Sequence, residues 1–220
     1  LSGGTLQFSH MAFDPLVRWN QAQQFEPRLA ERWYSVNDRT LRFHLRPGVL
    51  FHSGNELTAE DVRWTFDRLQ RSVDFKRVFS AFEGVRLIDR YTFDLVTFEP
   101  YPLVLNAATY IFPMDSQFYS GVDEKGLAKG RLQKYGDTFA SSHLSGTGPY
   151  RVSYRQQGVR TDFDRFDGYW DQNSKGNVSR IELTPIKSDP TRVAALLSGD
   201  VDFISPVPPN DHARIRNDSR

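Results

Sequence analysis

Five histidines are the side chains of this chain best suited to ligating a metal or exchanging protons near neutral pH. They are His10, His44, His52, His143 and His212. No pair has the H-x-x-x-H or H-E-x-x-H spacing that places two imidazoles on one helix face. His44 falls on the polar side of a predicted strand and His52 in a glycine-flanked turn, which indicates solvated or structural roles. The spacing therefore predicts no metal site.

A second candidate for chemistry is the glycine-rich run Gly146-Thr147-Gly148-Pro149. Phosphate loops hold an anion with successive backbone N–H groups, whereas Pro149 removes one donor and no helix start follows. We interpret this run as a structural turn. The sequence also lacks G-x-S-x-G, P-loop and Rossmann motifs, and the pair Glu60/Asp61 is placed to oppose a helix dipole. These patterns predict no catalytic residue, no cofactor and no enzyme.

Composition excludes several classes of partner. The 220 residues carry 28 basic and 27 acidic side chains, a net charge of +1, so no overall field favours nucleic acid or an anionic membrane. No run reaches the roughly 18 apolar residues that a membrane span needs. The absence of cysteine excludes disulfides and thiolate metal sites. The 39% of hydrophobic residues suffices for the core of one large or two small domains.

The clearest structural signals lie between residues 25 and 69. Two strand-like runs, 33–36 and 40–45, flank Asn37-Asp38-Arg39, residues that suit a tight turn. Alternation in the second run puts its leucines and its phenylalanine on one face. Thr58-Ala59-Glu60-Asp61 is a capping box, followed by an apolar stripe at helical spacing. The segment predicts a hairpin and then a capped helix.

The rest of the chain reads as strands with interspersed helices. The further predicted strands are residues 84–89, 92–97, 150–154, 161–166, 179–184 and a short one at 201–203. Predicted helices lie at 103–108 and 189–198, the second with Asp189 as N-cap and Gly199 as stop. Short helices at 127–134 and 138–142 are expected within 121–145, which we interpret as an exposed insertion. This order predicts an α/β or mixed α+β fold with a mixed β-sheet.

Four blocks of the sequence, in order, resemble the signature of one protein family. The first comprises the predicted hairpin and helix, with Pro47-Gly48-Val49, Phe51-His52-Ser53-Gly54 and Leu57 to Val62 at its centre. The others are Gly146-Thr147-Gly148-Pro149-Tyr150, Phe166-Asp167-Gly168-Tyr169-Trp170, and Asp189-Pro190-Thr191-Arg192 leading to Ser198-Gly199-Asp200-Val201-Asp202. The family is the extracytoplasmic solute-binding proteins, family 5, of peptide and nickel ABC importers.

This resemblance implies a fold and a function. The fold is type II periplasmic binding protein-like, and residues 1–220 would form most of its lobe I, with the first strand and the C-terminal lobe II missing. The implied function is the substrate-binding component of an ABC importer, which captures a peptide, a nickel chelate or a related small solute and delivers it to membrane permease subunits. The protein would be periplasmic, and the resemblance leaves a lipid anchor on the full-length protein open.

In similar proteins the cleft between the lobes is approached by three segments of this part of the chain. Here those segments hold His10 and Met11, Phe79 and Phe82, and Tyr110 and Phe112. We expect these side chains to contact the ligand, because ligand clefts combine apolar walls with a few polar groups. The alternative is that the aromatic side chains among them belong to the core.

Two other functions stay open at this point. The same fold can serve as the ligand-sensing domain of a transcription regulator, which would carry a DNA-binding segment before Leu1 instead of an export signal. A peptide hydrolase is the third alternative, but the sequence shows no nucleophile–base constellation that would support it.

Overall fold

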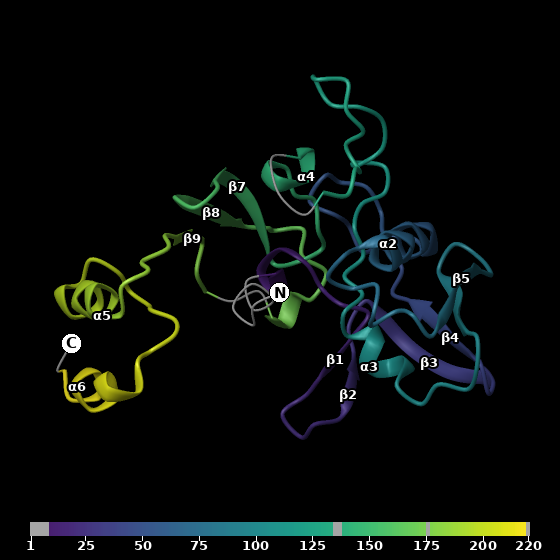
Figure 1. Ribbon diagram of the computed structural model, residues 1–220, viewed down its shortest axis with the longest axis horizontal. Helices are drawn as coiled ribbons and strands as arrows, with labels where there is room; N and C mark the ends of the chain where they lie inside the picture. Colours follow the sequence, from purple (N-terminus) through teal and green to yellow (C-terminus); the bar gives the residue numbers. More distant parts are fainter. Residues whose placement is uncertain (1–8, 134–137, 175–176, 219–220) are drawn as a thin grey trace.

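The structure, a computed structural model, describes residues 9–133, 138–174 and 177–218. Its strands are β1 (Val17–Trp19), β2 (Phe25–Pro27), β3 (Ala30–Asn37), β4 (Thr40–Leu45), β5 (Phe82–Leu87), β6 (Thr92–Thr97), β7 (Tyr150–Gln156), β8 (Arg160–Arg165) and β9 (Arg180–Leu183). Its helices are α2 (Ala59–Arg71), α3 (Val104–Ala108), α4 (Phe139–Ser142), α5 (Asp189–Ser198) and α6 (His212–Arg216) (Figure 1). Among the described residues, no helix is long and apolar enough to cross a membrane.

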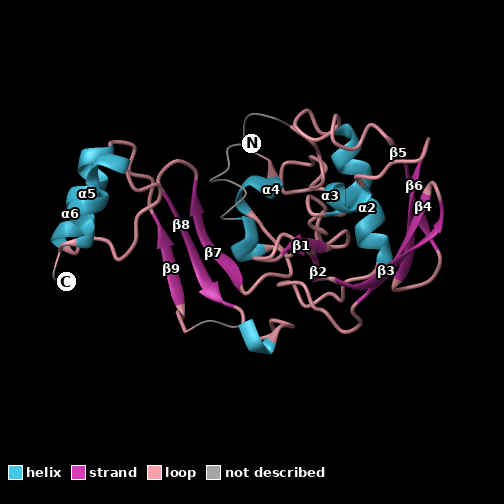
Figure 2. Cartoon of the chain, turned by 90° about the horizontal axis from the view of Figure 1, so that it is seen from below, coloured by secondary structure: helices cyan, strands magenta, loops and turns pink. Residues whose placement is uncertain are grey.

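A four-stranded sheet with the order β3-β4-β6-β5 forms one end of the molecule (Figure 2). The predicted hairpin is confirmed, since β3 and β4 pair around the turn at Asn37, and the strands predicted at 84–89 and 92–97 pair with each other as β5 and β6. The inner face of the sheet carries the alternating apolar side chains, and Phe43 of β4 stacks on Phe93 of β6 with ring centroids 5.3 Å apart. This face and helix α2 enclose the main core.

Helix α2 begins where the capping box predicts. Thr58 is its N-cap, and the carboxylate of Asp61 accepts hydrogen bonds from the Thr58 backbone N–H (2.8 Å) and hydroxyl (3.0 Å). Val62 and Phe66 are buried on its inner face, where the Phe66 ring meets those of Phe79 and Phe82 at 5.2 and 5.7 Å. A local signal in the sequence thus sets both the start and the buried side of this helix.

A second, three-stranded sheet has the order β7-β8-β9 and lies between the larger body and helices α5 and α6 (Figures 1 and 2). Its three predicted strands are confirmed. The predicted α/β class holds, but every strand pair among the described residues is antiparallel, so the parallel pairs of a mixed sheet are not found there. Helix α5 is capped by Ser188, one residue before the predicted Asp189, and stops at Gly199 in the left-handed conformation, as predicted.

Two predicted elements are wrong. No helix forms over residues 127–133, because the Asp123 carboxylate accepts the N–H groups of Lys125 and Leu127 (2.9 Å each) and folds the chain into a turn; residue 134 lies outside the described residues. No strand forms at 201–203, where the N–H of Val201 turns back to the carbonyl of Ala195 and Phe203 is 73% exposed. The short helix expected at 138–142 is present as α4.

Candidate functional site

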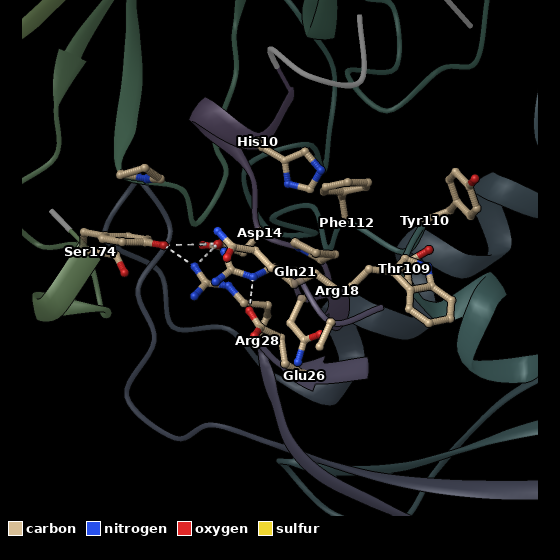
Figure 3. A pocket seen from close by; sticks show the side chains of 16 residues that line it. His10, Asp14, Arg18, Gln21, Glu26, Arg28, Thr109, Tyr110, Phe112 and Ser174 are labelled. Atoms are coloured by element: carbon tan, nitrogen blue, oxygen red, sulfur yellow. Dashed lines mark hydrogen bonds and ion pairs between the residues drawn. The ribbon is translucent and has the colours of Figure 1, made fainter. Parts of the chain in front are cut away.

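A cleft opens between the N-terminal part of the chain, the segment after α3 and the chain around the second sheet. It has a volume of about 1030 Å³ and is lined by the β1–β2 hairpin, by residues 109–112 after α3, and by Pro149, Tyr169 and Ser174 from the chain around the second sheet. Figure 3 shows these side chains converging from the separate elements. We take this cleft as the candidate site.

The β1–β2 hairpin forms one wall of the cleft. The side-chain oxygen of Asn20 accepts the N–H of Gln24 (2.9 Å), and Gln23 has φ 57°, so the chain reverses tightly between the strands. Trp19 lies against Phe25 with ring centroids 3.9 Å apart and stays 46% exposed. Arg18 of β1 forms an ion pair with Glu26 of β2. The hairpin therefore presents an exposed aromatic side chain, and its arginine and glutamate are paired with each other.

Three of the predicted ligand contacts lie together at this cleft. His10, Tyr110 and Phe112 all line it, and the His10 ring meets Phe112 edge-on with centroids 5.1 Å apart (Figure 3). Burial lowers the pKa of His10 and outweighs the opposing effect of Asp14. Met11 is half-buried and is not among the lining side chains.

Phe79 and Phe82 lie elsewhere. They are 0% and 1% exposed and belong to the core around Phe66, so they offer no surface to a ligand. The core alternative holds for this pair. The reason is that Phe66 of helix α2 packs against both rings, Phe79 just before β5 and Phe82 at its start.

The floor of the cleft is a buried polar network that the sequence did not reveal. Arg28 pairs with Asp14 (2.8 Å) and with Asp171 (2.9 Å), and it also donates to the Tyr169 hydroxyl (2.6 Å). The indole N–H of Trp170 donates to Asp14 (3.0 Å). Burial by itself lowers the pKa of Arg28, but the hydrogen bonds and charge of Asp14 and Asp171 raise it overall, so the guanidinium stays charged. This network connects the N-terminal segment to the chain that follows β8.

Trp170 sits between two arginines. The guanidiniums of Arg28 and Arg46 lie 4.7 and 4.8 Å from its ring centroid, within the range of cation–π contacts. The tyrosine–tryptophan pair at 169–170 belongs to a block of the family signature, and the structure gives it a structural role beneath the cleft. The tryptophan of the block was the available signal, because a buried indole N–H needs an acceptor, but nothing in the sequence identified its carboxylate partner.

The Gly146–Pro149 run is a structural turn, as predicted. It crosses the N-terminal segment so closely that a side chain does not fit: a Cβ on Gly146 would lie 2.0 Å from the carbonyl oxygen of Ala12, and one on Gly148 would lie 2.5 Å from its carbonyl carbon. The Gly148 N–H donates to the same Ala12 oxygen (3.0 Å). Asp14 donates its N–H to the Thr147 hydroxyl (3.2 Å). The run therefore fixes the segment that carries His10 and Asp14.

His52 supports this turn from the other side. Its Nε2 lies 2.9 Å from the Gly148 oxygen, and its Nδ1 lies 3.3 Å from the Gly146 nitrogen. The Gly146 N–H requires Nδ1 to accept, so the neutral tautomer with a proton on Nε2 satisfies both contacts. Burial lowers the pKa of His52 in agreement with this arrangement. The predicted structural role of His52 is confirmed.

The described residues of the cleft include no set of side chains suited to holding a metal. Across residues 9–133, 138–174 and 177–218, no group of three histidine, aspartate or glutamate side chains is arranged to bind an ion. The carboxylates of the floor are committed to Arg28 and to the hydrogen bonds described above. What the cleft offers is a lining of aromatic and neutral polar side chains over a floor of paired charges, a composition typical of ligand-binding clefts.

Comparison with known proteins points in the same direction. The sequence profile of the bacterial extracellular solute-binding proteins, family 5, matches residues 24–220. The chain is 28% identical over 214 residues to the dipeptide-binding protein of Escherichia coli K12, a match that covers 87% of this chain and 38% of the relative.

Solved structures share the fold. A dipeptide-binding protein from Pseudoalteromonas sp. SM9913, in complex with Met-Leu, superposes with a TM-score of 0.83 at 18% identity and covers 98% of this chain and 45% of that one. NikZ from Campylobacter jejuni, in complex with Ni(L-His), gives 0.72 at 20% identity, covering 87% of this chain and 37% of that one. The chain thus spans less than half the length of these proteins.

Proposed function

Because this chain belongs to family 5 of the bacterial extracellular solute-binding proteins, we propose that it forms one lobe of the receptor of an ABC importer. The observation that carries the proposal is the match of the family profile to residues 24–220, nearly the whole chain. The cleft lined by the β1–β2 hairpin, His10, Tyr110 and Phe112 is the proposed ligand-contacting surface of this lobe.

The proposed cargo is a peptide. The relative with 28% identity is a dipeptide-binding protein, whereas the nickel-complexed NikZ shares the fold at 20% identity. The cleft supports the same choice, because its acidic side chains are held by arginines and are not free to ligate a metal. A peptide would lay apolar side chains against the aromatic wall and satisfy its polar backbone at the rim.

The proposed mechanism is closure of two lobes on the ligand. This chain spans 38% of the dipeptide-binding relative, and we assign the second lobe to sequence outside residues 1–220. Ligand that contacts both lobes stabilises the closed form, which then docks on membrane permease subunits. The receptor would work outside the cytoplasm, as the family description states for its members. The relatives named above are binding proteins, so the alternative of a regulator's sensing domain gains no support from them.

Native mass spectrometry of the full-length protein, purified without refolding, tests the proposal. We expect a co-purified ligand whose mass and fragmentation identify a peptide, and we expect it to be lost after denaturation. A bound nickel complex would overturn the choice of cargo. A protein that carries no ligand and shows no heat of binding with peptide mixtures would overturn the receptor assignment itself.

A further inference from the structure

Every formal charge that lines the cleft within the described residues is paired. Arg18 is held by Glu26 on the hairpin. Arg28 is held by Asp14 at 2.8 Å and by Asp171 at 2.9 Å. The remaining titratable ring with a charge change near neutral pH is that of His10, whose pKa is lowered by burial. Among the described residues, this wall therefore offers no unpaired ion that could neutralise a charged group on a ligand.

Apart from neutral polar side chains such as Gln21, Thr109 and Ser174, the remaining surface of the cleft is largely aromatic. Trp19 is 46% exposed and rests on Phe25, which fixes the plane of its indole. Phe112 and His10, which also line the cleft, form an edge-on pair, and the lining residue Tyr110 is 39% exposed. Aromatic rings held in place by other rings lose little entropy when a further ring or an alkyl group packs on them.

We propose that this wall selects a peptide whose side chain is uncharged and apolar or aromatic, and that Trp19 is its main specificity-determining contact. The inference rests on the proposed function and makes it narrower. No described charge of this wall is free to compensate the desolvation of an acidic or basic side chain, whereas a phenyl or isobutyl group gains contact area there. The charged termini of the peptide are recognised by groups outside this wall.

Matched homopeptides test the selection, because every position carries the same side chain and the register on the wall does not matter. The probes are di- to pentapeptides of phenylalanine, leucine, alanine, aspartate or lysine. Each is titrated calorimetrically into the full-length protein after its endogenous ligand has been removed by unfolding and refolding. We expect the phenylalanine and leucine series to bind at least about tenfold more tightly than the aspartate and lysine series at equal length. Equal affinities, or tighter binding of a charged series, would overturn this inference and leave the receptor assignment standing. Failure of all series would overturn both.

Trp19→Ala tests the residue. We expect it to weaken the phenylalanine series by about fivefold and the alanine series much less, while Trp19→Phe restores most of the loss. Tyr154→Ala is the matched control, since Tyr154 has the same 46% exposure but lies on β7 away from the cleft lining. An equal loss for all series, or the same loss in the control, would show that Trp19 does not select the side chain.

Glu26→Gln provides a test by gain of binding. The change removes the partner of Arg18 and leaves a free guanidinium on the wall. We expect the variant to bind the aspartate series at least about threefold more tightly than the unchanged protein does, because the ligand carboxylate can then pair with Arg18 in place of Glu26. Unchanged affinity for the aspartate series would contradict the role given to charge pairing. The selectivity ratio of phenylalanine to aspartate peptides is the readout, because a general loss of fold would lower both.

Discussion

The sheet core and the cleft floor are both buried, but they are held together in different ways. The core between the β3-β4-β6-β5 sheet and α2 is built from aromatic and aliphatic side chains such as Phe43, Phe66 and Phe93, all 0% exposed. The floor joins distant segments through Asp14, Arg28 and their partners. The first tolerates other apolar side chains of similar volume, whereas the second depends on matched charges and hydrogen bonds. Side chains in this protein are therefore buried for two separate reasons, apolar packing in the core and charge pairing in the floor.

The largest effect is expected in the core. Phe66→Ala should lower the free energy of unfolding by about 4 kcal/mol, because it removes a ring packed against Phe79 and Phe82 and leaves a cavity. Urea denaturation followed by circular dichroism measures the change. Phe98→Ala is the control, since Phe98 is 56% exposed and should cost little. Similar small losses for Phe66→Ala and Phe98→Ala would mean that the inner face of α2 is not part of the core.

A somewhat smaller loss is expected at the floor. Arg28→Met should cost about 3 kcal/mol, because Asp14 and Asp171 lose their cation while Asp14 stays buried. The double change Arg28→Met with Asp14→Asn should recover part of the loss, which no cavity model of this site would produce. Arg63→Met is the matched control, as the Arg63–Glu60 pair is exposed on α2. Losses that are equal at Arg28 and Arg63 would remove the distinction drawn between the two regions.

The helix caps sharpen the comparison at a smaller scale. Thr58→Ala should cost about 1 kcal/mol through loss of the capping box of α2. Thr138 forms the same type of box on α4, a helix of 4 residues, and its change to Ala should cost less because that helix supports no core. Urea melts of the two variants provide the test. A larger loss at Thr138 would contradict the view that α2 organises the core.

The smallest effect is a pH dependence of the turn held by His52. Its pKa is lowered in the folded protein by burial, below the ordinary value of 6.5, so the unfolded chain binds the proton more readily. Stability is therefore fully present above pH 6.5 and falls as the pH drops from there through the folded pKa. Thermal melts between pH 7.5 and 5 should show this decline, and His52→Gln should reduce its slope. His10, whose pKa burial also lowers, contributes in the same direction and accounts for a residual slope. An unchanged slope in the variant would mean that His52 is not the sensitive group.

The same contrast explains what could be predicted from the sequence. The hairpin around Asn37 and the cap at Thr58 were predictable because their signals lie within a few residues of the structures they cause. The extent of the insertion at 121–145 stays a prediction. The turn at Asp123 was missed because a side chain that bonds to nearby N–H groups competes with helix formation without altering composition.

The candidate site was predicted only in part. His10, Tyr110 and Phe112 line the cleft, whereas Phe79 and Phe82 are buried. Residue type alone does not distinguish an exposed aromatic side chain from a buried one. Exposure depends on which elements cover a side chain, and that is decided by tertiary packing. The floor could not be predicted at all, since Asp14 finds its partners Tyr169 and Trp170 at separations of 155 and 156 residues. No periodic pattern in the sequence relates residues that lie so far apart.

That long separation imposes an order of events on the growing chain at the ribosome. The sheet of β3 to β6 with α2 is complete once residue 97 has emerged, but Asp14 must wait until Tyr169 follows it, 155 residues later. At about 5–20 residues per second this delay lasts roughly 8 to 30 s. The floor of the candidate cleft can therefore close only after the residues of the β3-β4-β6-β5 sheet are all available.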